Sequence, residues 1–420
     1  MRLRTFVIAL CCALPHLAQA EFNVDDDGTS LSISENGKPV LAYHHGWVDP
    51  PEGVDAHFRR TGYVHPLYGL DGEVLTQDFP DDHYHHRGVF WGWPNTTWKG
   101  KQVSTWSLKG ARQSPVSCAK PTFTNDTVTF SGENHWILDE APDHPIASER
   151  YRVVVHAATD ISRAIDFTIT IKNISDAPIT MLGATTDQKG YGGFNLRPDK
   201  TRKPMHFTSA MGPHTEDAFD IASPWVDLSY PMAPGSENLS GAAIFQHPAN
   251  PGYPHEWWII RHYAFLGHSW PGNTPYEIKP GDEVTLRYRL YTHRGTAKDG
   301  KVAEAFANYT QAMKEHAMPD ESKVLMFNAL WFKPDGGAEK YGEYLAAVGP
   351  ISKRYGGKKL SAAVPKQALI GKLDADLIFF VEWPNWTVFQ KFLADPEFQK
   401  VSPLREEAIT DSLLIRCDPM

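Results

Sequence analysis

The sequence predicts two domains of different class, a large antiparallel β-sandwich followed by a smaller α+β domain of the ferredoxin-like type. From Glu21 to about His293, short runs of alternating apolar and polar residues are separated by glycine and proline, which is typical of half-buried strands. After about residue 303 the apolar residues recur at spacings of three and four, which indicates helices. A polar stretch with a proline, residues 316–323, predicts a linker between the domains.

The N-terminal residues predict a signal peptide. Arg2 and Arg4 precede the apolar run Phe6–Leu14, and Ala18-Gln19-Ala20 is a small-x-small cleavage motif. We therefore expect cleavage after Ala20 and export to the periplasm or the cell exterior. The full division that we expect is a signal peptide, a β-sandwich domain, a helix with a linker, and a ferredoxin-like domain, over residues 1–20, 21–300, 301–322 and 323–420.

Strands of the sandwich are predicted by their period of two. Leu31 and Ile33 alternate with serines, and Asn36-Gly37 is a preferred pair for a hairpin turn. Residues 165–171 and 284–290 alternate apolar with polar side chains in the same way, which places one side of each strand in a core. No long helical stripe interrupts this region, so we expect an antiparallel two-layer architecture.

Elements of the second domain follow in a recognisable order. A helix over Ala303–Lys314 precedes the linker, and Val324–Phe332 is an apolar run of strand length. Five apolar residues at helical spacing predict an amphipathic helix: Tyr341, Tyr344, Leu345, Val348 and Ile351. The remaining elements are expected as strand, strand, helix and strand, near residues 359–373, 377–383, 386–408 and 412–416. The order β-α-β-β-α-β is that of a ferredoxin-like domain.

Composition disfavours several classes of partner. The formal net charge of -9 argues against nucleic acid, which binds basic surfaces. Beyond the signal peptide we find no segment long and apolar enough to predict a membrane-spanning helix. Two of the 4 cysteines lie in the signal peptide, and the other two, Cys118 and Cys417, could pair in an oxidising compartment or remain separate buried thiols.

The densest group of reactive side chains is Asp81-Asp82-His83-Tyr84-His85-His86-Arg87-Gly88, which we call the histidine block. In an extended segment His83 and His85 would share one face, where they could bind a divalent metal ion. The alternative is general acid–base chemistry, in which His85 or His86 moves a proton while Arg87 stabilises negative charge. A polar strand edge, whose histidines bond to backbone and water, is the third interpretation.

The same residue types recur in other clusters, which predicts a single polar cleft lined by aromatic rings. Such rings stack on the C–H faces of sugars while charged groups bind the hydroxyls, so the combination favours a carbohydrate ligand. The residues that we expect to carry catalysis are His65, His83, His85, His86 and Arg87. The residues that we expect to bind substrate are Asp82, Tyr191, Arg197, Trp258, Arg261 and Tyr263.

One resemblance covers residues 25–294. The motifs that carry it are His65-Pro-Leu-Tyr-Gly, Asp78-Phe-Pro, the histidine block, Gly190-Tyr-Gly-Gly-Phe, His247-Pro-Ala-Asn-Pro and Trp258–Tyr263. Together they resemble the bacterial PmoA-like family. The usual label of that family, methane oxygenase, does not suit this chain, because a particulate methane oxygenase subunit crosses the membrane with several helices.

The PmoA-like family is in turn similar to sugar-handling β-sandwiches of the aldose-epimerase group, whose active sites use histidine, arginine and a carboxylate. This resemblance implies a galactose-mutarotase-like form of the sandwich. It also implies functional roles for His65, the histidine block, Arg197 and Arg261. His262 departs from the pattern, because an acidic residue is expected there.

Residues 323–420 resemble the small ferredoxin-like domains that form dimeric α/β barrels. The resemblance rests on Tyr344, Val348-Gly-Pro, Phe380–Pro384 and Asp395–Phe398. Such domains pair through their sheets, so it implies a homodimer. The usual acidic residue and glycine after the second strand are replaced around Ile370-Gly-Lys, so the domain is expected to serve assembly, with a small-molecule pocket as the lesser option.

These features favour an exported carbohydrate-active enzyme, a hydrolase, lyase or epimerase that acts on a sugar or oligosaccharide. The alternatives are a non-catalytic glycan- or metal-binding protein and an oxygenase-like redox role of the C-terminal domain. The sequence requires no cofactor, and a divalent metal ion is the one that the histidine block would suit.

Overall fold

The computed structural model describes residues 20–317, 323–369 and 372–417. The chain divides into two compact units, Met1–Ala307 and Asn308–Met420, and each is described by itself. Apart from Ala20, the expected signal peptide lies outside the described residues. Within those residues, no helix has the length and apolar character that a membrane crossing requires.

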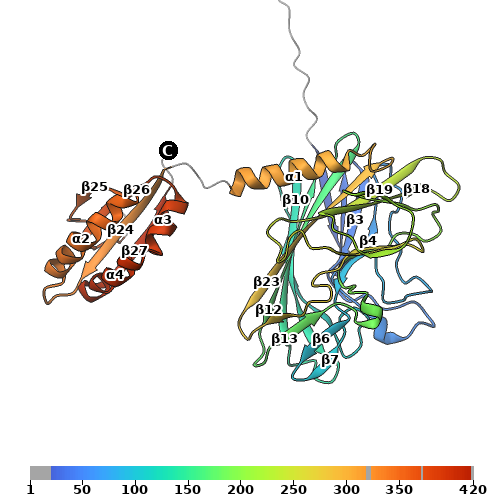
Figure 1. Ribbon diagram of the computed structural model, residues 1–420, viewed down its shortest axis with the longest axis horizontal. Helices are drawn as coiled ribbons and strands as arrows, with labels where there is room; N and C mark the ends of the chain where they lie inside the picture. The colour runs from blue at the N-terminus through green and yellow to red at the C-terminus, as the bar shows by residue number, and fades with distance from the viewer. Residues whose placement is uncertain (1–19, 318–322, 370–371, 418–420) are drawn as a thin grey trace, which may run out of the picture. The chain divides into compact units, whose positions relative to one another are not determined.

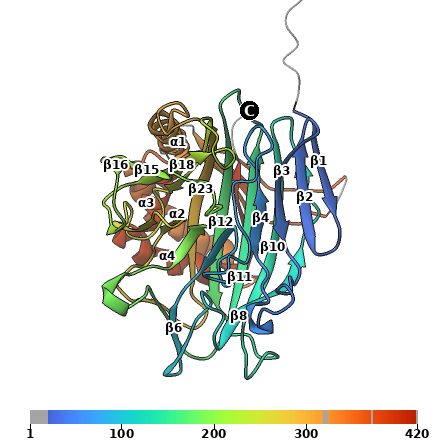
Figure 2. The ribbon, with the colours of Figure 1, turned by 90° about the vertical axis from the view of Figure 1, so that its right-hand side faces the viewer.

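Two large antiparallel sheets form the first unit (Figures 1 and 2). The nine-stranded sheet contains, in spatial order, β1 (Phe22–Asp26), β2 (Ser30–Glu35), β3 (Lys38–His44), β4 (Tyr63–Leu67), β5 (Val89–Gly92), β14 (Gly193–Leu196), β21 (Phe265–His268), β20 (Trp257–Arg261) and β17 (Ala218–Asp220). The ten-stranded sheet contains, in spatial order, β16 (Gly212–His214), β15 (His206–Ser209), β18 (Trp225–Pro231), β19 (Leu239–Gln246), β23 (Glu283–Arg294), β12 (Ser162–Asn173), β11 (Ala147–His156), β10 (Thr127–Leu138) and β8 (Ala111–Cys118), with β9 (Thr122–Phe123) beside β10.

Smaller elements complete this unit. A four-stranded sheet consists of β22 (Tyr276–Ile278), β13 (Ile179–Leu182), β6 (Asn95–Trp98) and β7 (Lys101–Val103). Two single-turn helices are η1 (Ala56–Phe58) and η2 (Thr186–Gln188). The helix α1 (Val302–Ala317) begins in this unit, close to the predicted start at residue 303, and the division between the units falls within it, after Ala307. In its first half Phe306 packs against Phe245 of β19, with ring centroids 5.3 Å apart.

The core lies between the two large sheets. Tyr43 of β3 contacts Phe130 of β10 at 5.0 Å, and Phe194 of β14 stacks on Tyr288 of β23 at 4.6 Å. The alternation predicted for β12 and β23 is confirmed, because their apolar residues are buried on the core side. The predicted turn is also confirmed, since Asn36 and Gly37 have φ angles of 51° and 76° and join β2 to β3. The first unit is thus a β-sandwich.

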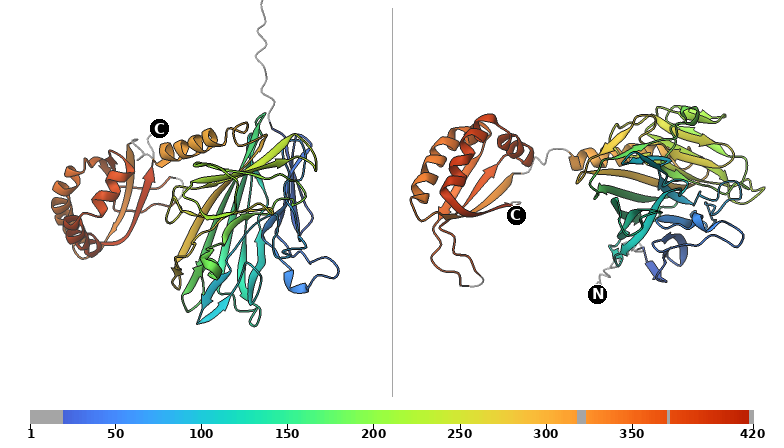
Figure 3. Two further views of the ribbon diagram at one scale, coloured as in Figure 1. Left: turned by 45° about the vertical axis from the view of Figure 1, so that its right-hand side comes forward. Right: turned by 90° about the horizontal axis from the view of Figure 1, so that it is seen from below.

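The second unit is an α+β domain with one four-stranded antiparallel sheet in the order β25-β26-β24-β27. Its elements along the chain are β24 (Val324–Phe332), α2 (Gly337–Arg354), β25 (Lys358–Ala363), β26 (Leu377–Trp383), α3 (Trp386–Leu393), α4 (Pro396–Ala408) and β27 (Ile409–Cys417). The helices cover one face of the sheet (Figure 3). The predicted order along the chain is confirmed, and in the sheet β24 and β26 are the two central strands while β27 and β25 are the edge strands.

Several boundaries differ from those predicted; for example, the last strand begins at Ile409, three residues before the predicted start. The strand expected over residues 359–373 ends at Ala363. The helical region expected over 386–408 is broken, because Asp395 caps α4 by accepting a hydrogen bond from the Glu397 N–H and Pro396 occupies the first helical position. Cys118 and Cys417 belong to different units, and both are free thiols.

Candidate functional site

Neighbouring strands of the nine-stranded sheet bring most of the predicted site residues to one end. The strand β5 starts directly after the histidine block, and β14 ends directly before Arg197. These strands are antiparallel neighbours, so the Arg197 N–H donates to the Gly88 carbonyl at 2.7 Å. The next strands, β21 and β20, are joined at the same end by a turn that contains Tyr263. Residues far apart in the sequence therefore meet because of strand order.

The histidine block is a pair of tight turns, so the expectation of an extended segment is wrong. The His83 N–H donates to the Pro80 carbonyl, and the His86 N–H donates to the His83 carbonyl, both at 2.9 Å. Because the chain turns, His83 and His86 face each other, with ring centroids 4.6 Å apart and planes 1° from parallel. His83 and His85 do not share a strand face as the metal hypothesis assumed.

Metal ligation by the block gains no support from the described part of the chain. Across residues 20–317, 323–369 and 372–417, no group of three or more histidine, cysteine, aspartate or glutamate side chains is arranged to hold a metal ion. His83 and His85 meet edge to face at 5.7 Å between ring centroids, which is an aromatic contact.

Three aromatic rings form a continuous stack from the surface inwards. Tyr263, which is 37% exposed, lies 5.5 Å from His83 with planes 7° apart. His83 then stacks on His86, and His86 packs against Phe265 at 4.6 Å. His85 meets the edge of His86 at 4.5 Å. The stack leads from an exposed ring to a buried imidazole.

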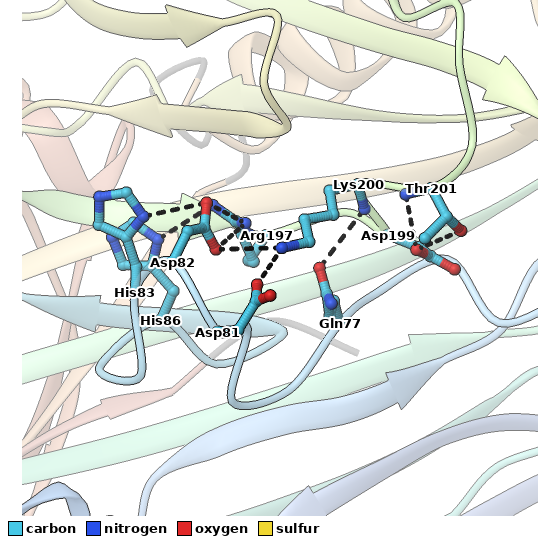
Figure 4. Close-up of polar contacts among 9 residues, drawn as sticks. All are labelled: Gln77, Asp81, Asp82, His83, His86, Arg197, Asp199, Lys200 and Thr201. Carbon is cyan, nitrogen blue, oxygen red and sulfur yellow. Dashed lines mark hydrogen bonds and ion pairs between the residues drawn. The ribbon is translucent and has the colours of Figure 1, made fainter. Parts of the chain in front are cut away.

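Asp82 joins this stack to a buried arginine (Figure 4). One terminal nitrogen of Arg197 donates to both oxygens of the Asp82 carboxylate, at 2.7 and 2.9 Å. The second oxygen of Asp82 lies 3.2 Å from Nδ1 of His83. Burial raises the pKa of Asp82, but Arg197 and His83 outweigh that effect and hold the pKa below its usual value. Asp82 is therefore an anion fixed between a guanidinium and an imidazole.

Two basic side chains add positive charge around the same carboxylates. Lys200 contacts Asp81, and its ammonium lies 4.0 Å from Asp82. The Arg197 guanidinium also lies 3.4 Å from Nδ1 of His86 and faces the Tyr263 ring at 5.4 Å. Arg197 itself is fully buried.

Burial keeps the two inner histidines neutral. Loss of hydration lowers the pKa of His85 to about 3, and the neighbouring His83 and Arg60 act in the same direction. Burial likewise lowers the pKa of His86 well below its usual value, with His85 as the next contribution. Both rings are therefore uncharged at neutral pH.

A second buried cluster lies around Arg87. The Arg87 side chain is fully buried, its Nε lies 3.2 Å from Asp78, and its guanidinium faces the Phe79 ring at 3.2 Å and the Tyr63 ring at 4.8 Å. The Tyr63 hydroxyl donates to Asp78 at 3.1 Å. Burial raises the pKa of Asp78, although Arg87 opposes the shift. This arginine, which the sequence predicts to stabilise negative charge, is enclosed by protein groups.

His65 belongs to the border of the Arg87 cluster. Its Nδ1 lies 3.0 Å from the Thr76 hydroxyl, and burial lowers its pKa to about 4, with Arg87 as the second cause. Gly88 lies against β4, and a Cβ there would lie 2.0 Å from the Val64 carbonyl oxygen. The close approach of β4 to the histidine block therefore requires glycine at this position.

Arg261 and His262 share one acidic partner in the loop before β17. Arg261 donates to Asp217 at 3.3 Å and faces the Phe219 ring at 3.6 Å. The His262 N–H donates to Asp217 at 2.8 Å, and its Nδ1 lies 3.0 Å from the same oxygen. Asp217 thus supplies the carboxylate near this turn, where the sequence comparison expected an acidic residue at position 262.

The other predicted substrate-binding residues lie at different depths. Tyr191 packs on Trp106 with ring centroids 5.1 Å apart, and Trp106 meets His86 at 5.6 Å, so the Trp106 ring lies between Tyr191 and His86. Trp258 is fully buried in the sandwich core and donates its indole N–H to the Ser223 carbonyl at 2.9 Å. The structure places Trp258 in the core and away from the stack.

Several residues of this site were not predicted from the sequence. Arg60 is buried behind the block and donates to the Trp91 carbonyl at 2.7 Å; burial lowers its pKa to about 9. Asp217 and Lys200 lie in loops and Phe219 lies in the short strand β17, and none of them has a motif around it. A signal for the turns was present, however, since proline followed by two aspartates at 80–82 is typical of turns.

The chain belongs to a family of unknown function (DUF6807), whose match covers residues 30–307. Residues 337–416 match a domain of unknown function (DUF1330). These matches establish two domains from families of unknown function, and they do not confirm the PmoA-like name. No curated protein matches the chain.

Solved structures show three representative likenesses. A protein of unknown function from Rhodopseudomonas palustris (RPA0582) is 31% identical over 28% of this chain and 92% of its own, with a TM-score of 0.23. Galactose 1-epimerase from Lactobacillus acidophilus is 7% identical over 66% of this chain and 99% of its own, with a TM-score of 0.30. An aldose epimerase homologue from C. elegans is 8% identical over 65% and 99%, with a TM-score of 0.27. Likenesses of this extent do not bear on function.

Proposed function

We propose that this protein is an exported carbohydrate-active enzyme, a hydrolase, lyase or epimerase with a galactose-mutarotase-like sandwich, in which His83 transfers the proton. The observation that carries the proposal is the position of Asp82 between Arg197 and His83. A carboxylate beside Nδ1 orients the imidazole in other base–carboxylate pairs, and Asp82 lies 3.2 Å from Nδ1 of His83. Nε2 of His83 is then the atom that exchanges a proton with substrate.

The proton-transfer role moves from His85 or His86 to His83 for an electrostatic reason. A general base works best when its pKa lies near the working pH. Burial holds the pKa of His85 at about 3 and that of His86 far below its usual value, so both are weak bases at neutral pH. His83 is less enclosed, with 37% of its side chain exposed. The two inner rings then serve as neutral packing and hydrogen-bonding partners.

A sugar ligand is supported by what surrounds His83 on the exposed side. Tyr263 presents a partly exposed ring parallel to the imidazole, and aromatic faces pack against the C–H faces of sugar rings. Lys200 and Asp81 supply charged groups for hydroxyls beside it. Export is supported by the signal sequence before Glu21.

The experiment compares native protein, His83→Gln and a matched control, His144→Gln, which changes an exposed histidine outside the cluster. Each is incubated with neutral and acidic oligosaccharides and reducing sugars, and proton NMR follows anomeric exchange, new reducing ends and unsaturated products. We expect turnover by native protein and the control, and a loss of about 100-fold or more in His83→Gln. Binding without turnover by native protein would overturn the enzyme and support the glycan-binding alternative. Equal rates in all three proteins would remove His83 from the chemistry.

We further propose that the C-terminal unit makes the protein a homodimer through the open face of its sheet. Across neighbouring strands, Ile415, Phe327 and Phe380 stand in one row, and Leu413 and Ile378 flank Ala329 in the next. Leu413 is 44% and Ile415 is 46% exposed. Apolar rows of this kind are typical of interfaces.

Light scattering of the full chain tests the homodimer. We expect twice the mass of one chain for native protein, and one chain for Phe327→Asp with an unchanged circular dichroism spectrum. A native protein of one-chain mass would refute it.

A further inference from the structure

The C-terminal unit contains a cavity of about 640 Å³ between its helices and its sheet. Protein interiors are close-packed, and voids larger than a water molecule are few. A space of this size lies within the range of ligand sites, roughly 300–1,000 Å³. It is therefore too large to be a packing defect of a small domain.

The cavity is long. Its lining includes Tyr341 in the first turns of α2 and Ser352 in the last turn, which are about 16 Å apart at 1.5 Å per residue. The helix α4 runs antiparallel to α2, because Lys340 pairs with Glu407 at one end and Arg354 with Glu397 at the other. Leu414, which is 49% exposed, lines the cavity on the β27 side and marks its contact with solvent.

Aromatic rings form the wall near the end of α2. Trp383 packs on Phe392 at 4.6 Å, and Phe392 packs on Phe398 at 4.4 Å. Trp383 is 3% exposed, and among the described residues its indole N–H has no hydrogen-bond partner. A buried donor without an acceptor costs free energy, which a ligand oxygen would recover. This unsatisfied group is the independent sign that the space receives a ligand.

Positive charge lies at the other end. Arg405 lines the cavity beside Tyr341 and Tyr344, and in the described parts of the chain it forms no ion pair with a carboxylate. Lys359 also lines the cavity, on the β25 side and nearer to Trp383, over the Phe379 ring at 4.6 Å, and Glu406 is the acidic residue of the lining. The charged lining is therefore net positive, and a guanidinium next to two phenol groups suits a carboxylate.

We propose that this cavity binds an elongated aromatic carboxylic acid that carries a second oxygen at its far end. The carboxylate pairs with Arg405 near Tyr341, the ring system lies against Phe392, and the distal oxygen accepts the Trp383 indole N–H. This binding is separate from the chemistry proposed for His83.

The test is calorimetric titration of the full chain with 4′-hydroxybiphenyl-4-carboxylate, and with 4-hydroxybiphenyl as the probe without the carboxylate. We expect one saturable site per native chain for the acid. Arg405→Met should weaken acid binding about ten-fold or more and leave binding of the neutral probe unchanged. Arg354→Met, an arginine of α2 outside the cavity lining, is the matched control and should bind like the native chain.

Ser402→Trp places a large ring in the cavity and should block both probes, with the thermal melting curve confirming that the unit is folded. Absence of saturable binding by the native chain overturns the proposal. Equal affinity of the acid for the native chain and Arg405→Met also overturns it, and that comparison does not depend on the folding of Ser402→Trp.

Discussion

Removing either member of the Asp82–Arg197 pair should have unequal consequences for stability. Arg197 has 0% of its side chain exposed, whereas Asp82 has 33%. Asp82→Asn leaves a buried guanidinium without its anion, and an unpaired buried charge costs about 3 kcal/mol or more. Arg197→Met leaves a carboxylate that water can reach, so the loss is limited to its charge-assisted hydrogen bonds, about 1–2 kcal/mol after solvent compensation.

The same reasoning predicts whether the double variant is more or less stable than Asp82→Asn. Asp82→Asn/Arg197→Met contains no unpaired buried charge, so it should be more stable than Asp82→Asn alone. Urea unfolding of the sandwich, followed by intrinsic fluorescence, measures the four free energies of unfolding. The exposed pair Arg59 and Asp49 is the control, and its matched variants should leave the unfolding midpoint nearly unchanged. If Arg197→Met were less stable than Asp82→Asn, the argument from the deeper burial of Arg197 would be refuted.

Protonation of Asp82 gives a further check on that pair. Its pKa is lower in the folded protein than in the unfolded chain, so its contribution is complete above the unfolded value near 3.8 and is lost as the pH falls through the folded value. The stability difference between native protein and Asp82→Asn should therefore persist from pH 7 to about pH 4 and shrink below it.

Three other variants test separate parts of the site. The pKa of His86 is lowered on folding, so its contribution is present above the unfolded value near 6.5 and falls by about 1.4 kcal/mol per pH unit below it. Because His85 and His65 have lowered pKa values too, His86→Gln should reduce the total slope in urea titrations between pH 6.5 and 5 by about that amount, and an unchanged slope would contradict the burial argument. Gly88→Ala should lower the melting temperature by several degrees, because its Cβ would lie 2.0 Å from the Val64 oxygen; a native melting curve would show that β4 can move away. Asp78→Asn should destabilise by about 3 kcal/mol in urea, because it leaves buried Arg87 without an anion, and a change below about 1 kcal/mol would argue against the ion pair.

Much of the fold was predicted from local periodicity, because buried side chains recur along the sequence with the period of a strand or of a helix. The strand Val324–Phe332 matches its predicted range, since a nine-residue apolar run between polar segments has one simple interpretation. The helical region after Trp386 was predicted as one element because apolar spacing continues past Asp395-Pro396, where capping breaks the helix. At Asp395-Pro396, the N-cap and the proline at the first helical position outweigh the longer apolar pattern.

The site was predicted only in part, because its geometry depends on strand order. Sequence density identified the histidine block, but treating it as extended placed His83 beside His85, whereas two turns stack His83 on His86. The pairing of Asp82 with Arg197 joins positions 115 apart, and no local pattern indicates it. Which histidine retains access to solvent also depends on burial by Phe265, a residue that only the sheet brings near.

The most direct test of the central claim is the tautomer of the His83 ring at about pH 8. Nitrogen-15 NMR of the native chain, with the signal assigned by its loss in His83→Gln, distinguishes a proton on Nδ1 from one on Nε2. We predict a proton on Nδ1, held by Asp82, and a free Nε2, with this preference lost in Asp82→Asn. A proton on Nε2 in the native chain, or a tautomer unaffected by Asp82→Asn, would contradict the proposed proton-transfer role of His83.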